Sequence, residues 1–333
     1  MFSLLFAFRN YPAIYILTSK RMEIREIEGY MEKHLAIKRR KISWRKALVS
    51  SLFLLPAIAF LIFSVYIPFA WNGVLSFQKW NGFSAPKWIG FDNYKNLLTD
   101  TIAQHDLLNS VFLAAFSTLG AVVLGLLLAA FIYKVTEREG ALYRLIIFLP
   151  VMLPTAVVGL LFAFVFNPEM GLLNNFLRVI GLGNFTHVWL EDKATVMWCI
   201  VAVNIWKMSG LTMMLSFASM KMLPESIFES SKLEGATYRE QFLKLILPLI
   251  KPTVLLSAVY TLVVNFKSYD IVFVLTRGGP GTTSQTVPIN MVKTAFNFSE
   301  FGYAASMGMI LALVVMLVVA VINRVLKGET YEY

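Results

Sequence analysis

Residues 108–133 read LNSVFLAAFSTLGAVVLGLLLAAFIY and contain no charged side chain. A run of about 20 apolar residues is long enough to cross the hydrocarbon core of a membrane as a helix. Five further stretches of comparable length are predominantly apolar, at 47–70, 142–166, 194–220, 252–275 and 303–325. The sequence therefore predicts an all-α, polytopic membrane protein with six transmembrane helices.

The composition supports this class. Of 333 residues, 57% are hydrophobic and 15% are charged, whereas soluble globular proteins carry about 25% charged residues. This balance argues against a cytosolic enzyme. The formal net charge of +10 is interpreted first as a signal of orientation in the membrane, so no nucleic-acid partner is expected. The single cysteine, Cys199, excludes an intrachain disulfide and a cysteine-rich metal site.

The basic residues are distributed unequally between the two sides of the membrane. When the loops are assigned alternately, the tail 1–46, the loops 134–144 and 221–251 and the end after 323 together carry 21 Lys and Arg residues. The opposite side carries 7. The positive-inside rule then places both termini in the cytoplasm. Most tryptophans agree, because they fall at or beyond the outer ends of the predicted spans (Trp71, Trp80, Trp88, Trp189 and Trp198).

Three regions follow from these assignments: a cytoplasmic tail over 1–46, a six-helix domain over 47–325 and a short cytoplasmic tail over 326–333. In the first tail, apolar residues recur at spacings of three and four among charges (Ile24, Ile27, Met31 and Leu35). This pattern predicts an amphipathic helix on the inner leaflet, with a solvated basic tail as the alternative. The apolar start of the chain has no basic segment before it, so a signal peptide is not expected.

The inner connection 221–251 carries the start and stop signals of two helices. Pro224 suits the first turn of a helix over 225–233 that ends near Gly235. Such signals predict a folded element where a short, structureless loop would suffice.

The second helix of this connection is expected to open with a capping box. Thr237 stands three residues before Glu240, the spacing at which the two side chains cap each other's backbone N–H groups. This helix is expected to stop at Pro248. The pair would form a cytoplasmic knob for docking a partner, or alternatively an amphipathic pair lying flat on the membrane.

The same connection resembles a known motif. It reads ESSKLEG at 229–235 and, nine residues later, LILP at 245–248. This is similar to the EAA loop of ABC-importer permeases, with the pattern E-A-A, three residues, G, nine residues, I-x-L-P. Ser230 and Ser231 replace the alanines, and both are small enough for close helix packing. Leu245 replaces the isoleucine, which is a mild change.

A second motif resembles the sugar-importing branch of these permeases. The stretch TRGGPG at 276–281 is similar to the T-x-G-G-P turn of the maltose, glycerol-phosphate and multiple-sugar permeases. The resemblance covers roughly 108–325. It favours a sugar importer over the amino-acid and peptide branches.

The resemblance implies a type I ABC importer permease fold and a set of partners. These are a second homologous permease subunit, two ATPase subunits, an extracytoplasmic solute-binding protein, membrane lipid and an oligosaccharide substrate. The chain would reside in the bacterial cytoplasmic (inner) membrane and would not itself be an enzyme. No G-x-x-x-x-G-K-[ST] phosphate loop occurs in the sequence, so ATP and Mg are expected on the partner ATPase and no cofactor on this chain.

In such importers the EAA loop sits in a groove of the ATPase. The resemblance therefore assigns Glu229 a polar contact with the ATPase and Gly235 the bend between the two helices. Three apolar residues are expected to pack into the groove, namely Ile227, Phe228 and Ala236.

Polar residues inside the fourth and fifth predicted spans are the candidate substrate pathway. They are costly against lipid and should face the interior: Asn204, Lys207, Asn265, Lys267, Ser268 and Asp270. Three aromatic residues are candidates for stacking on sugar rings, with ordinary packing as the alternative: Trp206, Phe266 and Tyr269.

Charge in these spans bears on the substrate. Internal pairing is the simpler explanation for two of these charges: Lys267 and Asp270 are three residues apart and could neutralise each other on one helix, which leaves Lys207 without a partner. An acidic, uronate-type oligosaccharide would match this charge, and a neutral oligosaccharide or other small solute is the alternative.

Two other classes of protein remain as alternatives. A secondary transporter or channel would have no use for the elaborate cytoplasmic knob. A membrane enzyme would need a catalytic cluster, but the three histidines (His34, His105 and His187) lie in a tail and two outer loops and form no zinc motif. No metal site is therefore expected.

Overall fold

The computed structural model describes residues 44–325. The predicted amphipathic helix of the first tail and the segment 326–333 lie outside the described residues. The chain divides after Ile67 into two compact units, which are described separately.

The described part of the first unit is one apolar helix. It comprises α3 (Trp44–Leu61), which contains Pro56, and the π-helical turn η1 (Ile62–Tyr66). The helix continues into α4 (Ile67–Leu75), and Ser51–Leu75 is long and apolar enough to cross a membrane.

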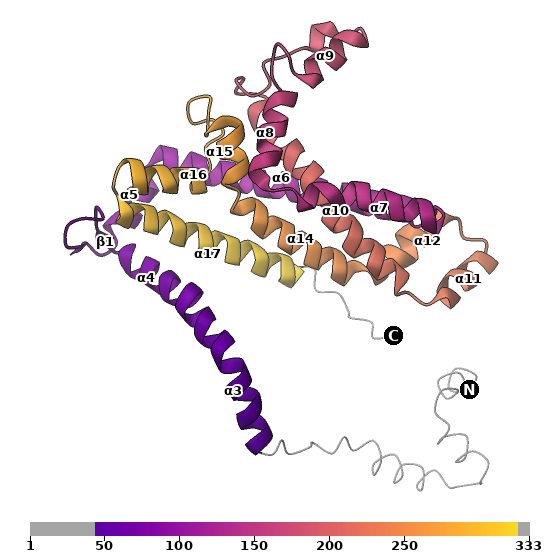
Figure 1. Ribbon diagram of the computed structural model, residues 1–333, viewed down its shortest axis with the longest axis horizontal. Helices are drawn as coiled ribbons and strands as arrows, with labels where there is room; N and C mark the ends of the chain where they lie inside the picture. Colours follow the sequence, from indigo (N-terminus) through magenta and orange to yellow (C-terminus); the bar gives the residue numbers. More distant parts are fainter. Residues whose placement is uncertain (1–43, 326–333) are drawn as a thin grey trace. The chain divides into compact units, whose positions relative to one another are not determined.

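The second unit is almost entirely helical (Figure 1). Its one sheet among the described residues is a two-stranded antiparallel hairpin that pairs β1 (Gln78–Lys79) with β2 (Lys87–Trp88). In chain order, the next elements are α5 (Asp92–Thr99), α6 (Thr101–Ile132), α7 (Glu137–Met152), α8 (Thr155–Val165), α9 (Leu172–Val179), the 3-10 turn η2 (Gly183–Phe185) and α10 (Val196–Lys221). The remainder are α11 (Glu225–Leu233), α12 (Tyr238–Gln241), the π-helical turn η3 (Phe242–Ile246), α13 (Leu247–Leu249), α14 (Lys251–Phe266), α15 (Asp270–Thr276), α16 (Val287–Val292), the π-helical turn η4 (Lys293–Asn297) and α17 (Phe301–Val325).

Helix α6 is central to the packing of this unit. It lies along α10 and α14, α10 also contacts α7, and α17 packs on α14 and α16. Small residues bring α6 and α10 together: a Cβ atom added at Gly125 would lie 2.8 Å from the carbonyl oxygen of Ser209. Close backbone approach at small residues is typical of helix pairs in membranes.

Within residues 44–325, four helices are each long and apolar enough to span a membrane, namely the one ending at Leu75, α6, α10 and α17. Two bent pairs raise the number to six if each pair is one span. The all-α fold with up to six spans agrees with the prediction, but the predicted third and fifth spans are not straight helices.

The predicted third span, 142–166, is divided between α7 and α8, which meet at an angle of 100°. The break lies at Leu153, whose ψ of 138° is extended, immediately before Pro154. Proline disfavours the helical conformation in the residue before it, which accounts for the position of the bend.

The predicted fifth span, 252–275, is also interrupted. Helix α14 ends at Phe266 and α15 begins at Asp270, so residues 267–269 are non-helical. A second bend of 70° separates α14 from the helical segment 238–249 that precedes it.

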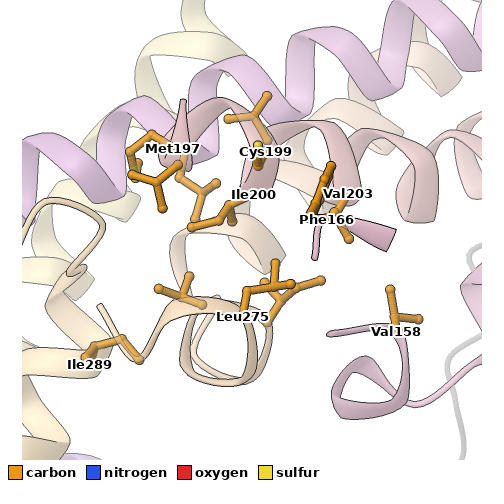
Figure 2. Packing of buried hydrophobic residues seen from close by; sticks show 13 residues of the cluster. Val158, Phe166, Met197, Cys199, Ile200, Val203, Leu275 and Ile289 are labelled. Atoms are coloured by element: carbon orange, nitrogen blue, oxygen red, sulfur yellow. The ribbon is translucent and has the colours of Figure 1, made fainter. Parts of the chain in front are cut away.

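Hydrophobic side chains gather in clusters at both ends of the bundle. At the end away from the connection 221–251, residues of α8, α10, α15 and α16 pack together, among them Val158, Ile200, Leu275 and Ile289 (Figure 2). A second cluster joins α6 and α10 to the connection 221–251 through Ile132, Met213, Phe228 and Ile246. The connection 221–251 is therefore part of the packed structure.

Candidate functional site

The connection 221–251 folds as two helices, as predicted. Helix α11 covers 225–233, and Gly235 then adopts a φ of +81°, a left-handed conformation that glycine tolerates best. The capping box is confirmed: the Glu240 backbone N–H donates to Thr237 Oγ1 at 3.4 Å, and the Thr237 N–H donates to Glu240 Oε2 at 3.0 Å.

The second helix ends at Leu249, one residue beyond the predicted stop at Pro248. The chain then bends around Ile250 before α14 begins.

The two helices, which we call the coupling knob (221–251), are fixed to the inner end of α6. The Tyr238 hydroxyl donates to the carbonyl oxygen of Ala130 at 2.7 Å, and the ring centroids of Phe228 and Tyr133 are 5.9 Å apart. The Lys134 ammonium lies 3.9 Å from the centroid of the Tyr238 ring. Contacts from both helices of the knob thus converge on residues 130–134.

The proposed ATPase-contacting residues of the knob differ in exposure. Glu229 and Gly235 are exposed, and Ile227 and Ala236 are half-buried. Phe228 is only 9% exposed and belongs to the inner hydrophobic cluster. Its expected role in a partner's groove is therefore corrected: the ring holds the knob on its own subunit.

Sequence reasoning missed the most exposed apolar residues of the knob. Leu233, the last residue of α11, is 90% exposed, and Met222 is 83% exposed. The available signal was an apolar side chain within the charged run KLE at 232–234. These two residues offer a partner more apolar surface than Phe228 does.

Lys207 is buried in the middle of α10, with 5% of its surface exposed. Its ammonium donates to Thr155 Oγ1 at 2.5 Å, and Thr155 is the first residue of α8, beside the bend. Sequence reasoning identified Lys207 but not Thr155, whose contact joins residues 52 positions apart.

The two predicted pathway asparagines are buried between helices. Asn265 donates its amide N–H to Thr118 Oγ1 on α6 at 3.4 Å. Asn204 is 4% exposed, and within residues 44–325 its Nδ2 atom has no hydrogen-bond partner. Asn265 therefore joins α14 to α6 and presents little surface to a substrate.

The break at 267–269 holds the other predicted pathway residues. Lys267 and Asp270 are exposed, whereas Ser268 and Tyr269 are half-buried. Within the described range no ion pair joins Lys267 to Asp270. Their expected pairing is wrong because Lys267 follows the end of α14 and Asp270 begins α15, so the helical spacing does not apply.

The aromatic candidates separate into two kinds. Phe266 is 2% exposed and is a packing residue. Trp206 is 38% exposed and meets the Phe162 ring edge-on, with centroids 5.2 Å apart. Tyr269 stacks on Phe273 at 5.2 Å, so only Trp206 and Tyr269 keep ring surface for a ligand.

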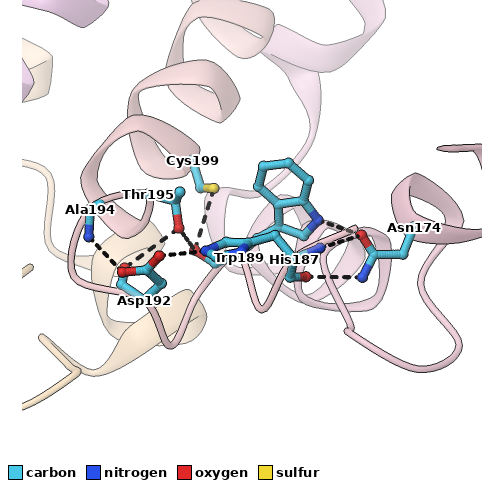
Figure 3. Close-up of polar contacts among 7 residues, drawn as sticks. All are labelled: Asn174, His187, Trp189, Asp192, Ala194, Thr195 and Cys199. Carbon is cyan, nitrogen blue, oxygen red and sulfur yellow. Dashed lines mark hydrogen bonds and ion pairs between the residues drawn. The ribbon is translucent and has the colours of Figure 1, made fainter. Parts of the chain in front are cut away.

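The segment between α8 and α10 is held by a hydrogen-bonded network (Figure 3). Asn174 accepts the Trp189 indole N–H at 2.8 Å and donates to the carbonyl oxygen of His187 at 2.9 Å. His187 also bonds Asp192. The pKa of Asp192 is lowered, first by the backbone N–H of Ala194 and then by His187.

The segment between α8 and α10 and the TRGGPG turn line a cleft of about 290 Å³. Its walls include Asn167, Glu191 and Pro280. The turn itself is closed by the hydroxyls of Thr276 and Ser284, 2.7 Å apart, and by a bond from Ser284 Oγ to the carbonyl oxygen of Gly279 at 2.6 Å. The motif identified in the sequence is thus a compact, internally bonded element.

A helical membrane subunit with a folded inner knob, and with buried polar groups at two broken spans, has the architecture of a transport permease. Residues 121–328 match the family described as the binding-protein-dependent transport system inner membrane component. The chain belongs to this family, whose members are transport subunits of ABC transporters and not enzymes themselves.

Several relatives cover most of the chain. A probable ABC transporter permease protein of Bacillus subtilis, YurN, is 35% identical over 81% of this chain and 92% of its own length. The diacetylchitobiose uptake system permease protein NgcF of Streptomyces coelicolor is 30% identical over 89% and 88%. The sulfoquinovosyl glycerol transport system permease protein SmoG of Agrobacterium fabrum is 27% identical over 90% and 96%.

The fold is also found among solved structures. A chain of a bacterial ABC transporter involved in the import of the acidic polysaccharide alginate superposes with a TM-score of 0.73, at 23% identity, over 85% of this chain and 96% of that chain. This similarity establishes the permease fold.

Proposed function

We propose that this chain forms, with a second homologous permease subunit, the translocation pathway of an ATP-driven oligosaccharide importer in the bacterial inner membrane, with both termini in the cytoplasm. Two ATPase subunits would bind at the coupling knob and a solute-binding protein would deliver the substrate on the outer side. The observation that carries this proposal is the knob itself, packed on α6 while Glu229 and Leu233 remain exposed for a partner.

Three observations support a sugar as the substrate. The TRGGPG turn resembles that of the sugar branch, NgcF and SmoG are named for sugar-containing substrates, and Trp206 and Tyr269 retain partly exposed rings. Aromatic faces are common partners for apolar faces of ligands. A small solute of another kind is the alternative.

We further propose that the oligosaccharide is acidic. Lys207 is buried, and its one hydrogen bond among the described residues is to the neutral hydroxyl of Thr155. An ammonium in the membrane interior is stabilised by an anionic partner, and a uronate would supply one during passage. The exposed Lys267 adds a second positive charge in the same pair of spans.

The test compares uptake of uronate and neutral oligosaccharides of equal length in cells that express the chain with its partner genes. Lys207→Met keeps the length of the side chain and removes the charge, and should reduce uronate uptake strongly. Lys87→Met, on the exposed strand β2, is the matched control and should transport normally. Immunoblots of membranes verify equal amounts of protein.

Unchanged uronate uptake by Lys207→Met would contradict the acidic substrate. Uptake of neutral oligosaccharides in preference to uronates by the wild type would do the same. Either result would leave the importer proposal intact.

A further inference from the structure

Helix α6 is a single uninterrupted rod that reaches from the outer turn to the coupling knob. It has 32 residues and contains no proline, so its length is about 48 Å. It packs along α10 and α14, which supports it over its length. Both of its ends bond to elements that the sequence motifs single out.

At the outer end, three polar side chains form one face of α6. Asp106, Asn109 and Ser110 are spaced at i, i+3 and i+4, so they lie together. Asn109 Nδ2 donates to the carbonyl oxygens of Thr283 at 2.9 Å and Gln285 at 2.8 Å. Ser110 Oγ accepts the backbone N–H of Val287 at 3.0 Å.

Asp106 adds a buried carboxylate to this anchor. Its Oδ2 atom accepts from Gln285 Nε2 at 2.9 Å and from Asn290 Nδ2 at 2.7 Å, and Lys293 donates to Gln285 Oε1 at 2.6 Å. Because the residue is fully buried, these bonds are protected from water and geometrically restrictive. The segment 283–290 is therefore clamped to α6.

The clamp extends to the TRGGPG turn. Ser284, within the clamped segment, is bonded to Thr276 and to the carbonyl oxygen of Gly279. The Cβ atom of Gln285 lies 3.2 Å from the position that a Cβ would occupy at Gly278. A displacement of the outer end of α6 must therefore carry the turn with it.

At the inner end, α6 bonds the coupling knob through the Tyr238–Ala130 hydrogen bond and the Phe228–Tyr133 ring contact. Asn109 and Ala130 are 21 residues apart, or about 32 Å along the helix. The two anchors are thus too distant to interact directly.

We propose that α6 is a rigid link that couples the knob to the TRGGPG turn, and that Asp106, Asn109 and Ser110 are the positioning residues of its outer end. The inference rests on the proposed function, in which an ATPase moves the knob. ATP-driven movement of the knob is then transmitted along α6 as a movement of the turn that lines the outer cleft.

The test monitors the turn while nucleotide acts on the opposite side of the membrane. Thr282→Cys places a thiol on the exposed turn, and the native Cys199 is buried, so labelling by a membrane-impermeant maleimide reports the turn. The complex is purified with its ATPase subunits, reconstituted in nanodiscs and labelled with and without ATP and vanadate. In the complex that carries Thr282→Cys alone, the labelling rate should differ between the samples with and without ATP and vanadate.

Asn109→Ala, and independently Ser110→Ala, should abolish that difference while the ATPase subunits remain bound. Tyr238→Phe, which removes the inner hydrogen bond, should reduce the same difference. Asn109→Ala combined with Tyr238→Phe should have no greater effect than Asn109→Ala alone, because both act on one link. Residues this far apart otherwise behave additively. Asn96→Ala, on the exposed face of α5, is the control and should leave the difference unchanged.

The link would be overturned if the labelling rate still depended on nucleotide in both Asn109→Ala and Ser110→Ala. It would also be overturned if the Thr282→Cys complex hydrolysed ATP with no change in its labelling rate. Purification of the chain from native membranes without any ATPase subunit would overturn the proposed function and the link together.

Discussion

Replacing Gly125 by alanine is expected to destabilise the contact between α6 and α10. The new Cβ atom would lie 2.6 Å from Thr212 Cβ, 2.8 Å from the carbonyl oxygen of Ser209 and 2.9 Å from the backbone nitrogen of Met213. Ordinary contacts begin at 3.4 Å, so the shortfall at the Ser209 oxygen is 3.4 − 2.8 = 0.6 Å. Two of the three atoms belong to the α10 backbone, so a rotamer change cannot relieve the overlap. Overpacking of this kind costs about 1–3 kcal/mol.

The measurement is the thermal midpoint of the detergent-solubilised protein, followed by fluorescence-detected size exclusion. A loss of about 1–3 kcal/mol corresponds to a decrease of roughly 2–12 °C, at about 2–4 °C for each kcal/mol. The control is Gly183→Ala, because a Cβ there meets nothing within 4 Å, and it should melt like the wild type. Equal midpoints for the two variants would refute the inference that α6 and α10 are in backbone contact at Gly125.

Three further outcomes are expected. Gly235→Leu should insert normally but lose the ATPase subunit during purification, because a φ of +81° costs a non-glycine residue about 1–2 kcal/mol; retention of the ATPase would contradict the docking role. In intact cells, an impermeant thiol reagent should label Lys87→Cys and Thr282→Cys but not Thr237→Cys, and the reverse pattern would invert the orientation. Because a backbone N–H and a histidine lower the pKa of Asp192 below its ordinary 3.8, its contribution to stability is complete above that pH and is lost as the pH falls further. Asp192→Asn should therefore lower the thermal midpoint at neutral pH and match the wild type in strong acid. A difference in midpoint that stays the same at every pH would contradict a stabilising role of the ionised Asp192 carboxylate.

The sequence predicted features that depend on local rules. The capping box of Thr237 and Glu240 follows from a spacing of three residues, and Gly235 follows from the need for a left-handed conformation. Both lie where they were expected. The number of apolar segments was also predictable, because hydropathy reflects the solvent around a helix.

Features that depend on tertiary contacts were missed. The run containing Pro150 and Pro154 remains apolar across its bend, so hydropathy alone does not report the 100° break. The interruption at 267–269 removed the helical spacing on which the pairing of Lys267 and Asp270 depended. The bonds from Asp106 to Gln285 and Asn290 join residues 179 and 184 positions apart, and no local pattern predicts them.

The burial of Phe228 within its own subunit affects how a partner would engage the coupling knob. Because this ring, the Tyr238 hydroxyl and the capping box already fix the two helices, docking needs little further ordering of the backbone. A preorganised surface binds with a smaller loss of conformational entropy than a loop that folds on contact. The packed knob also deforms little, so a displacement of Leu233 by a partner moves α6 through the side chains that join them.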